Sequence, residues 1–177
     1  MSKRVSYQDG YVVALRYPGQ WLDIREFIQP KAPEVASLYA QIGPDYWACF
    51  DWVCRNISYR SEFGEFWQFP GETLRGSGDC EDSSILLTSL LRNFTRAYVA
   101  VGTYRGLGHA WTQHNGEILD TTFTTARFPP DPESYVCCFL FNDEEVIELW
   151  PGALEEVLAA SRQEALKLTL MAQALRE

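Results

Sequence analysis

The sequence predicts an α+β fold, and three observations support that prediction. Apolar residues in the first half of the chain recur at three- and four-residue steps, which is the spacing of a buried helix face. From residue 97 onward they recur at every second position, which is the spacing of a strand. The strand-like segments follow one another with short turns between them. Helices followed by a meandering antiparallel sheet define the α+β class.

The N-terminal half is expected to be mainly helical. The apolar run 11–15 is compatible with an edge strand, and Pro18-Gly19 marks a turn. A helix is expected to open at Pro30–Pro33 and to run to about Ile42, where Gly43-Pro44 ends it. A second helix begins after the N-cap Asp45, and its buried face is formed by Trp47, Phe50, Val53, Cys54 and Ile57.

Residues 60–78 are predicted to form a loop that packs onto the domain, because the segment is rich in aromatic residues and glycines. A third helix is expected from Cys80 to about Phe94. The last element, 153–175, is expected to be a long amphipathic helix with apolar positions from Leu154 through Ala165 and Leu168 to Met171. Between these helices we expect strands at 97–104, 109–114, 117–122, 135–141 and 146–150, with a proline-rich connection at 129–132.

The bulk composition describes one domain over residues 1–177. Hydrophobic residues make up 46% of the chain, enough to bury a sizeable core. The net charge of -9 argues against nucleic-acid binding and against binding to an anionic membrane. No stretch reaches the roughly 18 continuous apolar residues of a membrane span. No apolar segment follows the basic N-terminal residues, so we expect no signal peptide and a cytoplasmic location.

Cys80 stands at the start of the third predicted helix, in the run 76–82 (GSGDCED). The first turn of a helix has unpaired backbone N–H groups and a partial positive charge. We therefore expect this thiol to ionise easily, and the thiolate is the reactive form. The other four cysteines do not have the spacing of a zinc site, and we interpret them as small buried hydrophobic residues.

Asn115-Gly116 predicts a β-hairpin, because this dipeptide is preferred in two-residue type I′ turns. Strand alternation then puts His109, Trp111 and Asp120 on one face and His114 on the other. His109 and Asp120 become diagonal neighbours with a backbone separation of about 7–8 Å, within side-chain reach. The hairpin therefore selects His109 over the other histidine, and a cysteine, a histidine and an aspartate in this order suggest a nucleophile, its base and the base's orienting group.

The chain resembles the transglutaminase-like superfamily, a branch of the papain-like cysteine enzymes, over about residues 46–123. The resemblance rests on four segments in this order and spacing: 51–59 (DWVCRNISY), 78–82 (GDCED), 108–111 (GHAW) and 119–122 (LDTT). The segment 66–74 (FWQFPGETL) is similar to that of bacterial transglutaminase-like cysteine proteinases. The resemblance implies a transglutaminase/papain-like core, with the cysteine-bearing helix packed on the sheet.

The same resemblance implies that Cys80 is the nucleophile, His109 the general base and acid, and Asp120 the residue that orients His109. The expected activity is hydrolysis of an amide bond in a protein or peptide substrate, through a thioacyl-enzyme. Amine transfer of the transglutaminase type is the alternative, and a non-catalytic binding module on the same fold is a further one. The expected oxyanion donors are the Cys80 backbone N–H and either Gln68 or the Trp67 indole.

Several of these residues also have a simpler interpretation. Trp67 and Gln68 could equally serve packing and loop anchoring, and Trp111 is expected to shield the reacting pair from water rather than to bind substrate. Some members of the superfamily bind calcium through the carboxylates that flank the cysteine, which here are Asp79 and Glu81. We favour a helix cap for Asp79 and a dipole complement for Glu81, and expect no cofactor, because no full set of oxygen ligands can be read from the sequence.

Overall fold

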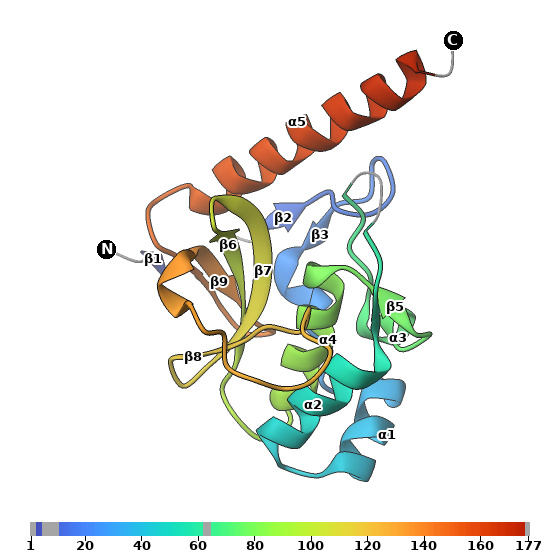
Figure 1. Ribbon diagram of the computed structural model, residues 1–177, viewed down its shortest axis with the longest axis vertical. Coiled ribbons are helices and arrows are strands. Elements are labelled where there is room, and N and C mark those ends of the chain that lie inside the picture. Colours follow the sequence, from blue (N-terminus) through green and yellow to red (C-terminus); the bar gives the residue numbers. More distant parts are fainter. Residues whose placement is uncertain (1–2, 5–10, 62–64, 176–177) are drawn as a thin grey trace.

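The computed structural model describes residues 3–4, 11–61 and 65–175, and it describes side chains for 11–61, 65–160, 170–171 and 173–175. A six-stranded antiparallel sheet lies against a group of helices (Figure 1). Helix α4 (Cys80–Leu91) packs directly on the sheet, while α1 (Pro33–Ile42) and α2 (Tyr46–Asn56) pack on α4. The predicted α+β class is therefore confirmed.

The sheet is a meander with one long return connection. Its strand order is β1-β10-β9-β6-β7-β8, and every neighbouring pair is antiparallel. A Cβ atom at Gly102 would lie 1.9 Å from the Val136 carbonyl oxygen, so only glycine allows strands β6 and β9 to approach at their register shift. The strands are β1 (Lys3–Arg4), β6 (Tyr98–Tyr104), β7 (Leu107–His114), β8 (Glu117–Leu119), β9 (Tyr135–Phe141) and β10 (Val146–Glu148).

Helix α4 is the centre of the molecule. Every residue from Asp82 to Leu91 is buried, because the sheet covers one side of this helix while α1 and α2 cover the other. A helix covered on all sides needs apolar residues all round or satisfied polar ones. Thr88 meets this need, because its hydroxyl lies 3.2 Å from the Thr112 hydroxyl on β7. This burial fixes the N-terminal end of α4, and Cys80 with it, against the sheet.

The segment 60–78 is more regular than the sequence predicts. It contains helix α3 (Pro70–Thr73) and strand β5 (Ser77–Gly78), which pairs in parallel with β4 (Ser58–Tyr59). A two-residue strand has no periodicity that a sequence can reveal, and its partner lies across the long loop. The boundary predictions of Phe94 for α4 and Thr122 for β8 were wrong, since the elements end at Leu91 and Leu119.

Two further segments complete the described chain. The apolar run at 11–15 provides strand β2 (Val12–Val13), which pairs with β3 (Leu22–Asp23); the single-turn helices η2 (Ile24–Phe27) and η3 (Pro132–Ser134) are connectors. Helix α5 (Ala153–Ala174) extends away from the sheet in Figure 1.

The first turns of α5 pack on the sheet and its far end does not. Leu154 and Leu158 are buried, whereas Met171 is 63% exposed. Ala165 and Leu168 lie outside the residues whose side chains are described. Of the helices in the described part of the chain, none combines the length and apolar character that crossing a membrane requires.

Candidate active site

Cys80 is the first residue of α4, where a reciprocal cap fixes the helix end. Asp79 accepts a hydrogen bond from the Asp82 backbone N–H at 3.1 Å, and Asp82 accepts one from the Asp79 N–H at 3.2 Å. Asp82 also accepts from the Gln68 N–H at 2.8 Å, which ties the preceding loop to the helix. A Cβ at Gly78 would lie 2.6 Å from the Asp82 Cβ, so glycine is required there. The predicted capping role of Asp79 is confirmed.

The hairpin brings His109 and Asp120 together as predicted. Asn115 and Gly116 both have positive φ, 48° and 79°, as a type I′ turn requires. The His109 Nε2 lies 2.9 Å from Asp120 Oδ2. His114 points to the other face, where its Nε2 lies 3.1 Å from the Thr95 hydroxyl.

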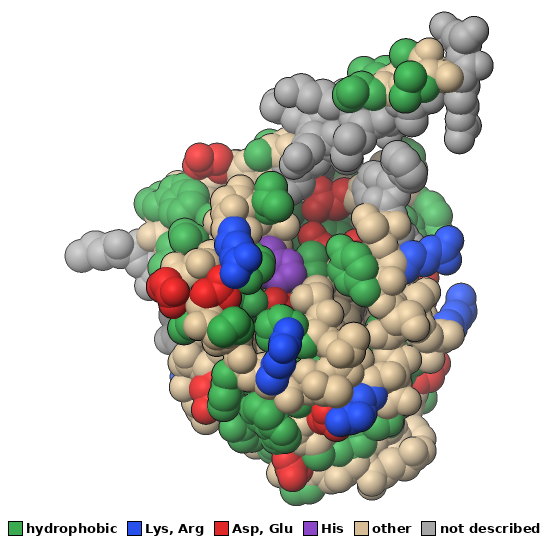
Figure 2. Space-filling model, in the orientation of Figure 1, with side chains coloured by type: hydrophobic (Ala, Val, Ile, Leu, Met, Phe, Trp, Pro, Cys, Tyr) green, Lys and Arg blue, Asp and Glu red, His purple; other side chains and the backbone are tan. Residues whose placement is uncertain are grey.

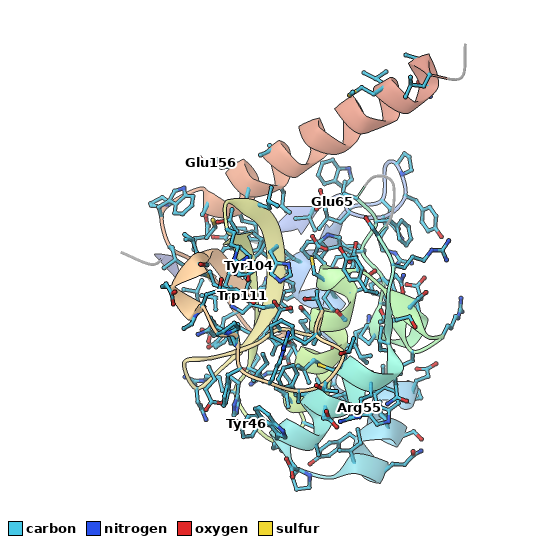
Figure 3. The ribbon with its side chains drawn as sticks, viewed as in Figure 1. Tyr46, Arg55, Glu65, Tyr104, Trp111 and Glu156 are labelled. Carbon is cyan, nitrogen blue, oxygen red and sulfur yellow. The ribbon has the colours of Figure 1, made fainter. Side chains whose placement is uncertain are left out.

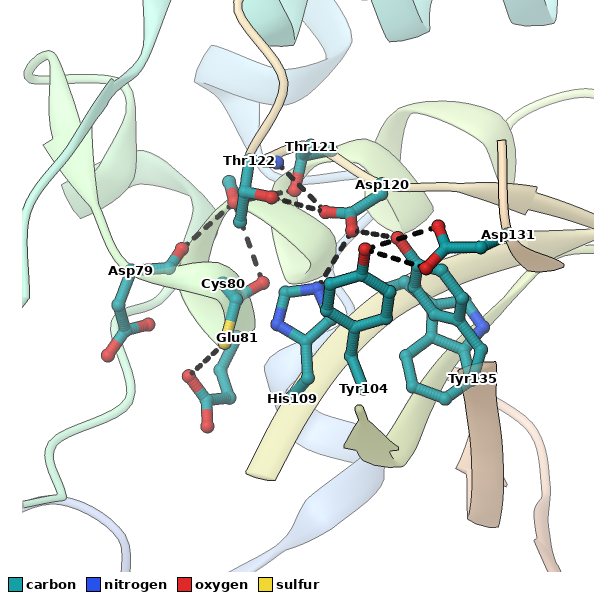
Figure 4. Close-up of polar contacts among 12 residues, drawn as sticks. Asp79, Cys80, Glu81, Tyr104, His109, Asp120, Thr121, Thr122, Asp131 and Tyr135 are labelled. Atoms are coloured by element: carbon teal, nitrogen blue, oxygen red, sulfur yellow. Dashed lines mark hydrogen bonds and ion pairs between the residues drawn. The ribbon is translucent and has the colours of Figure 1, made fainter. Parts of the chain in front are cut away.

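Cys80 lies on the same side of β7 as His109. The backbone N–H of Ala110, the residue after His109, donates a hydrogen bond to the Cys80 sulfur. In Figure 4 the His109 ring lies between Cys80 and Asp120, with its second ring nitrogen facing the cysteine. Because Asp120 accepts from Nε2, Nδ1 is the nitrogen that can take a proton from the thiol side. The described geometry thus brings Cys80, His109 and Asp120 into one group.

Asp120 is held by donors on all sides, including one residue that the sequence analysis missed. The Tyr135 hydroxyl donates to Asp120 Oδ2 at 2.6 Å, and the Thr122 hydroxyl donates to Oδ1 at 2.7 Å. Burial opposes ionisation of Asp120, but the hydrogen bonds from His109, Tyr135 and Thr122 outweigh it, so its pKa lies below the usual value. No local signal marks Tyr135, because only the order β9-β6-β7 brings it to the hairpin.

The surroundings of the thiol have the opposite effect, and the prediction of easy ionisation was wrong. Burial and the charges of Glu81 and Asp79 raise the pKa of Cys80 well above its usual value, despite the helix N-terminus and the Ala110 N–H. The Cys80 thiol donates a hydrogen bond to Glu81 Oε2 at 3.1 Å. Like charges and desolvation exceed the helix-end effect here because an acidic residue flanks Cys80 on each side in the sequence.

These carboxylates also perturb one another. Burial and the neighbouring Glu81 raise the pKa of Asp79 to about 8, and burial and the Asp79 charge raise that of Asp82 to about 7. The pKa of Glu81 is also raised, by burial first and with a contribution from Glu65. Figure 2 shows acidic side chains beside a histidine in a hollow on this face. The thiol therefore faces a group of acids that tend to hold protons.

The three predicted polar or aromatic neighbours have different positions. Trp67 is buried in the core against Phe27 and Phe141, and among the described side chains its indole Nε1 has no hydrogen-bond partner. The Gln68 side chain accepts from the Thr73 hydroxyl at 3.3 Å. Trp111 is buried beside His109, with ring centroids 6.2 Å apart. Packing is thus a role for both tryptophans, and Trp67 keeps an unused donor.

Asp79 and Glu81 are the two candidate calcium ligands that the sequence resemblance implies. They lie within hydrogen-bonding contact of each other, so a proton between them or a cation could relieve their repulsion. Calcium takes six to eight oxygen ligands. Within the described residues no group of three or more His, Cys, Asp or Glu side chains is arranged to hold a metal ion. The described side chains therefore do not fit a calcium site.

The remaining cysteines match their predicted role. Cys49, Cys54 and Cys138 are buried, Cys137 is half-buried, and all five cysteines are free thiols. Burial, as the largest cause, raises the pKa of Cys49 to about 11 and the pKa values of Cys54 and Cys137 to about 12. The Cys80 pKa is raised too, so it is the position of Cys80 beside His109, and not its pKa, that distinguishes it from these three thiols.

Comparison with known proteins gives a similarity of fold. No family model matches the sequence, and no curated protein sequence matches it. The structure is similar to that of EGTA-treated LapG from Legionella pneumophila, with a TM-score of 0.55 and 15% identity, over 67% of this chain and 76% of that chain. Calcium-bound LapG matches with a TM-score of 0.48 and 14% identity, over 75% of this chain and 99% of that chain. The first similarity shows that this chain has the fold of LapG.

Proposed function

We propose that this protein is a cysteine-dependent hydrolase that cleaves an amide bond in a protein or peptide. The observation that carries the proposal is the hydrogen bond between His109 Nε2 and Asp120 Oδ2, formed beside a thiol that begins a buried helix. A histidine oriented in this way can accept a proton on its second nitrogen. The fold supports the proposal, because the LapG chain that shares it is a transglutaminase-like cysteine protease.

In the proposed reaction the resting enzyme holds a neutral Cys80 thiol beside the His109 imidazole. Because the pKa of Cys80 is raised, the thiol gives its proton to His109 Nδ1 as the sulfur attacks the carbonyl carbon. The imidazolium then protonates the leaving nitrogen, the C–N bond breaks and a thioester remains. Water adds to the thioester while His109 takes its proton, and the acid product leaves as the thiol is restored. Asp120 fixes the tautomer and stabilises the imidazolium.

The proposed oxyanion donors are the Cys80 backbone N–H and the Trp67 indole. The Cys80 N–H belongs to the first turn of α4, where backbone donors have no partner within the helix. The Trp67 Nε1–H is a buried donor without a partner among the described side chains, and it belongs to the same core cluster as Cys80. A buried donor that is left unpaired in the resting protein costs stability, which an oxyanion would recover.

The alternative of amine transfer uses the same thioester. Hydrolysis and transfer differ only in whether water or a primary amine attacks the thioester. No specific contact of the described site favours the amine. Hydrolysis is therefore the primary proposal, with transfer as its competitor in the assay.

The test is an assay of a defined peptide mixture by mass spectrometry, with and without a primary amine such as cadaverine. We expect new peptide termini with the wild type and none with Cys80→Ala. Cys138→Ala is the matched control, because Cys138 is a buried thiol on β9 whose charged neighbour is Glu156 of α5, and the substitution should leave cleavage unchanged. Amine incorporation without cleavage would replace hydrolysis by transfer. If neither product forms from any peptide of the mixture, the proposal of an enzyme fails and a binding module remains.

A further inference from the structure

A pocket opens beside the proposed active site, on the side of α4 that faces α2. Its volume is about 320 Å³. That volume is the liquid share of about ten water molecules, which is ample for one amino-acid side chain. Its walls come from the end of α2 with strand β4, from the start of α4 and from the loop after β8. Three elements far apart in sequence thus enclose one concave site.

The pocket adjoins the reacting groups at several points. Thr121 and Thr122 line it directly after Asp120, and Thr122 donates to Asp120. Ser83, which also lines it, contacts the Cys80 carbonyl oxygen at 3.5 Å and the Thr121 hydroxyl at 2.6 Å. A substrate chain that crosses the Cys80 sulfur would therefore pass the mouth of this pocket.

Tyr59 forms the border between the pocket and the thiol. It lines the pocket and is 59% exposed. Burial raises the pKa of its phenol, and the charges of Cys80, Asp79 and Glu81 raise it further, which places the ring within electrostatic range of the thiol. Tyr59 thus lines the pocket and also lies near the acidic surroundings of Cys80.

The pocket differs in charge from those surroundings. Its polar lining is made of hydroxyl groups, and Arg55 is the only charged side chain among the described residues that line it. Arg55 forms an ion pair with Asp51, to which its Nε donates at 2.7 Å, and this contact uses one of the five N–H donors of the guanidinium. Glu65, which belongs to the acidic group near the thiol, lies far from Arg55 in Figure 3.

We propose that this hydroxyl-lined pocket, with Arg55 at its edge, binds an acidic side chain of the substrate next to the bond that is cleaved. Hydroxyl and guanidinium groups donate hydrogen bonds to a carboxylate, and an Arg–carboxylate contact is the strong form of this pairing. On the other side of the thiol, Asp79 and Glu81 offer such a carboxylate further acids in place of a cation. A basic side chain would be bound less well in the pocket than beside Asp79 and Glu81. The inference rests on the proposed hydrolase function, which it extends to substrate selection.

The test is cleavage profiling with a synthetic peptide library in which Asp, Glu, Gln, Lys and Arg vary on both sides of each bond. We expect the wild type to prefer an acidic residue over a lysine at one fixed position near the cleaved bond, by about three- to tenfold. Arg55→Glu should lose or reverse this preference, and Arg55→Gln should weaken it. Arg96→Glu is the matched control, because Arg96 is exposed beyond the opposite end of α4 and the substitution changes the net charge equally.

The outcomes separate the two proposals. Cleavage by the wild type without an acidic preference overturns the pocket assignment and leaves the hydrolase intact. An acidic preference that persists in Arg55→Glu, or that Arg96→Glu changes as strongly, overturns it as well. If the wild type cleaves nothing in the library, the hydrolase proposal fails and the pocket assignment with it. Circular dichroism melting of the variants verifies that each one is folded.

Discussion

Two buried groups of carboxylates lie on either side of His109, and their pKa values move in opposite directions. Asp120 accepts hydrogen bonds from His109, Tyr135 and Thr122, and its pKa is lowered. Asp79 and Glu81 lie beside the Cys80 thiol and beside each other, and their pKa values are raised. Figure 4 shows both groups in one view.

The difference shows that burial alone does not decide the charge of an acid. Both groups are desolvated, and desolvation raises the pKa in each case. Around Asp120 the hydrogen-bond donors offset the free-energy cost of desolvation, while around Asp79 the nearest groups are further acids. One side of the site is therefore built to hold a negative charge and the other to hold protons. The following variants test each side.

The largest effect is expected from Asp120→Asn. The asparagine side chain has one acceptor oxygen and one NH2 donor group. It therefore cannot accept hydrogen bonds from His109 Nε2, Tyr135 and Thr122 together, as the carboxylate does. The wrong imidazole tautomer should therefore dominate, and kcat should fall on the order of 10³ to 10⁴-fold. Steady-state kinetics on a cleaved peptide would measure this. Asp131→Asn is the matched control, since Asp131 is bonded to Tyr104 and Arg105 instead; an equal loss there would contradict the assignment.

Glu81→Gln should make the Cys80 thiol more acidic. The substitution replaces a group that can ionise, 3.1 Å from the sulfur, by one that cannot, and both the charge of Glu81 and its hydrogen bond raise the thiol pKa. We expect the alkylation midpoint to move to lower pH, and the rate at pH 7 to rise several-fold. Iodoacetamide labelling read at the Cys80 peptide by mass spectrometry measures this.

The control for this labelling experiment is Glu155→Gln, a substitution at an exposed position on α5. It should leave the Cys80 midpoint unchanged. A midpoint that stays constant in Glu81→Gln would mean that the flanking acids do not set the reactivity of the thiol.

Tyr135→Phe should have a moderate effect, because it removes one donor from Asp120 and keeps the ring. A hydrogen bond to a charged group is lost, so we expect activity to fall about tenfold. The pKa of Asp120 should rise, and the loss of activity on acidification should begin at a higher pH. Tyr104→Phe is the matched control, since that hydroxyl donates to Asp131. Equal pH profiles in wild type and Tyr135→Phe would restrict Tyr135 to packing.

The smallest effect is expected in the pH dependence of stability. Asp79 has a folded-state pKa of about 8 against a usual 3.8, so the folded protein binds more protons than the unfolded chain between these values. Stability should therefore fall as pH rises through this window. Asp79→Asn keeps the cap and should flatten this slope in urea unfolding at pH 5 and pH 8.

Asp45→Asn is the matched control for the stability experiment, because Asp45 is an exposed N-cap on α2 that accepts from the Ala48 N–H. It should keep the wild-type slope. A slope that is as steep in Asp79→Asn as in the wild type would show that Asp79 does not carry the extra protons.

Local patterns were enough to predict most of the elements and one corner of the site. The period of apolar residues gave the helices α1, α2 and α4, and Asn115-Gly116 gave the register that brings His109 to Asp120. The same count placed His114 on the opposite face. These predictions succeed because turn geometry and side-chain alternation act over a few residues.

Predictions that depended on contacts between distant segments failed or could not be made. Strand β5 has a partner across a long loop, and Tyr135 reaches Asp120 only through the order of the sheet. The pKa of Cys80 was predicted in the wrong direction, because the helix end was considered without its burial.

The sequence by itself determined which residue types begin each helix, where the chain turns and which histidine shares a face with an aspartate. Only the tertiary structure decided the charge state of the acids and of the thiol. The physical reason is that capping and alternation are local, whereas desolvation and Coulomb interactions depend on everything that lies within a few ångströms, whatever its position in the chain.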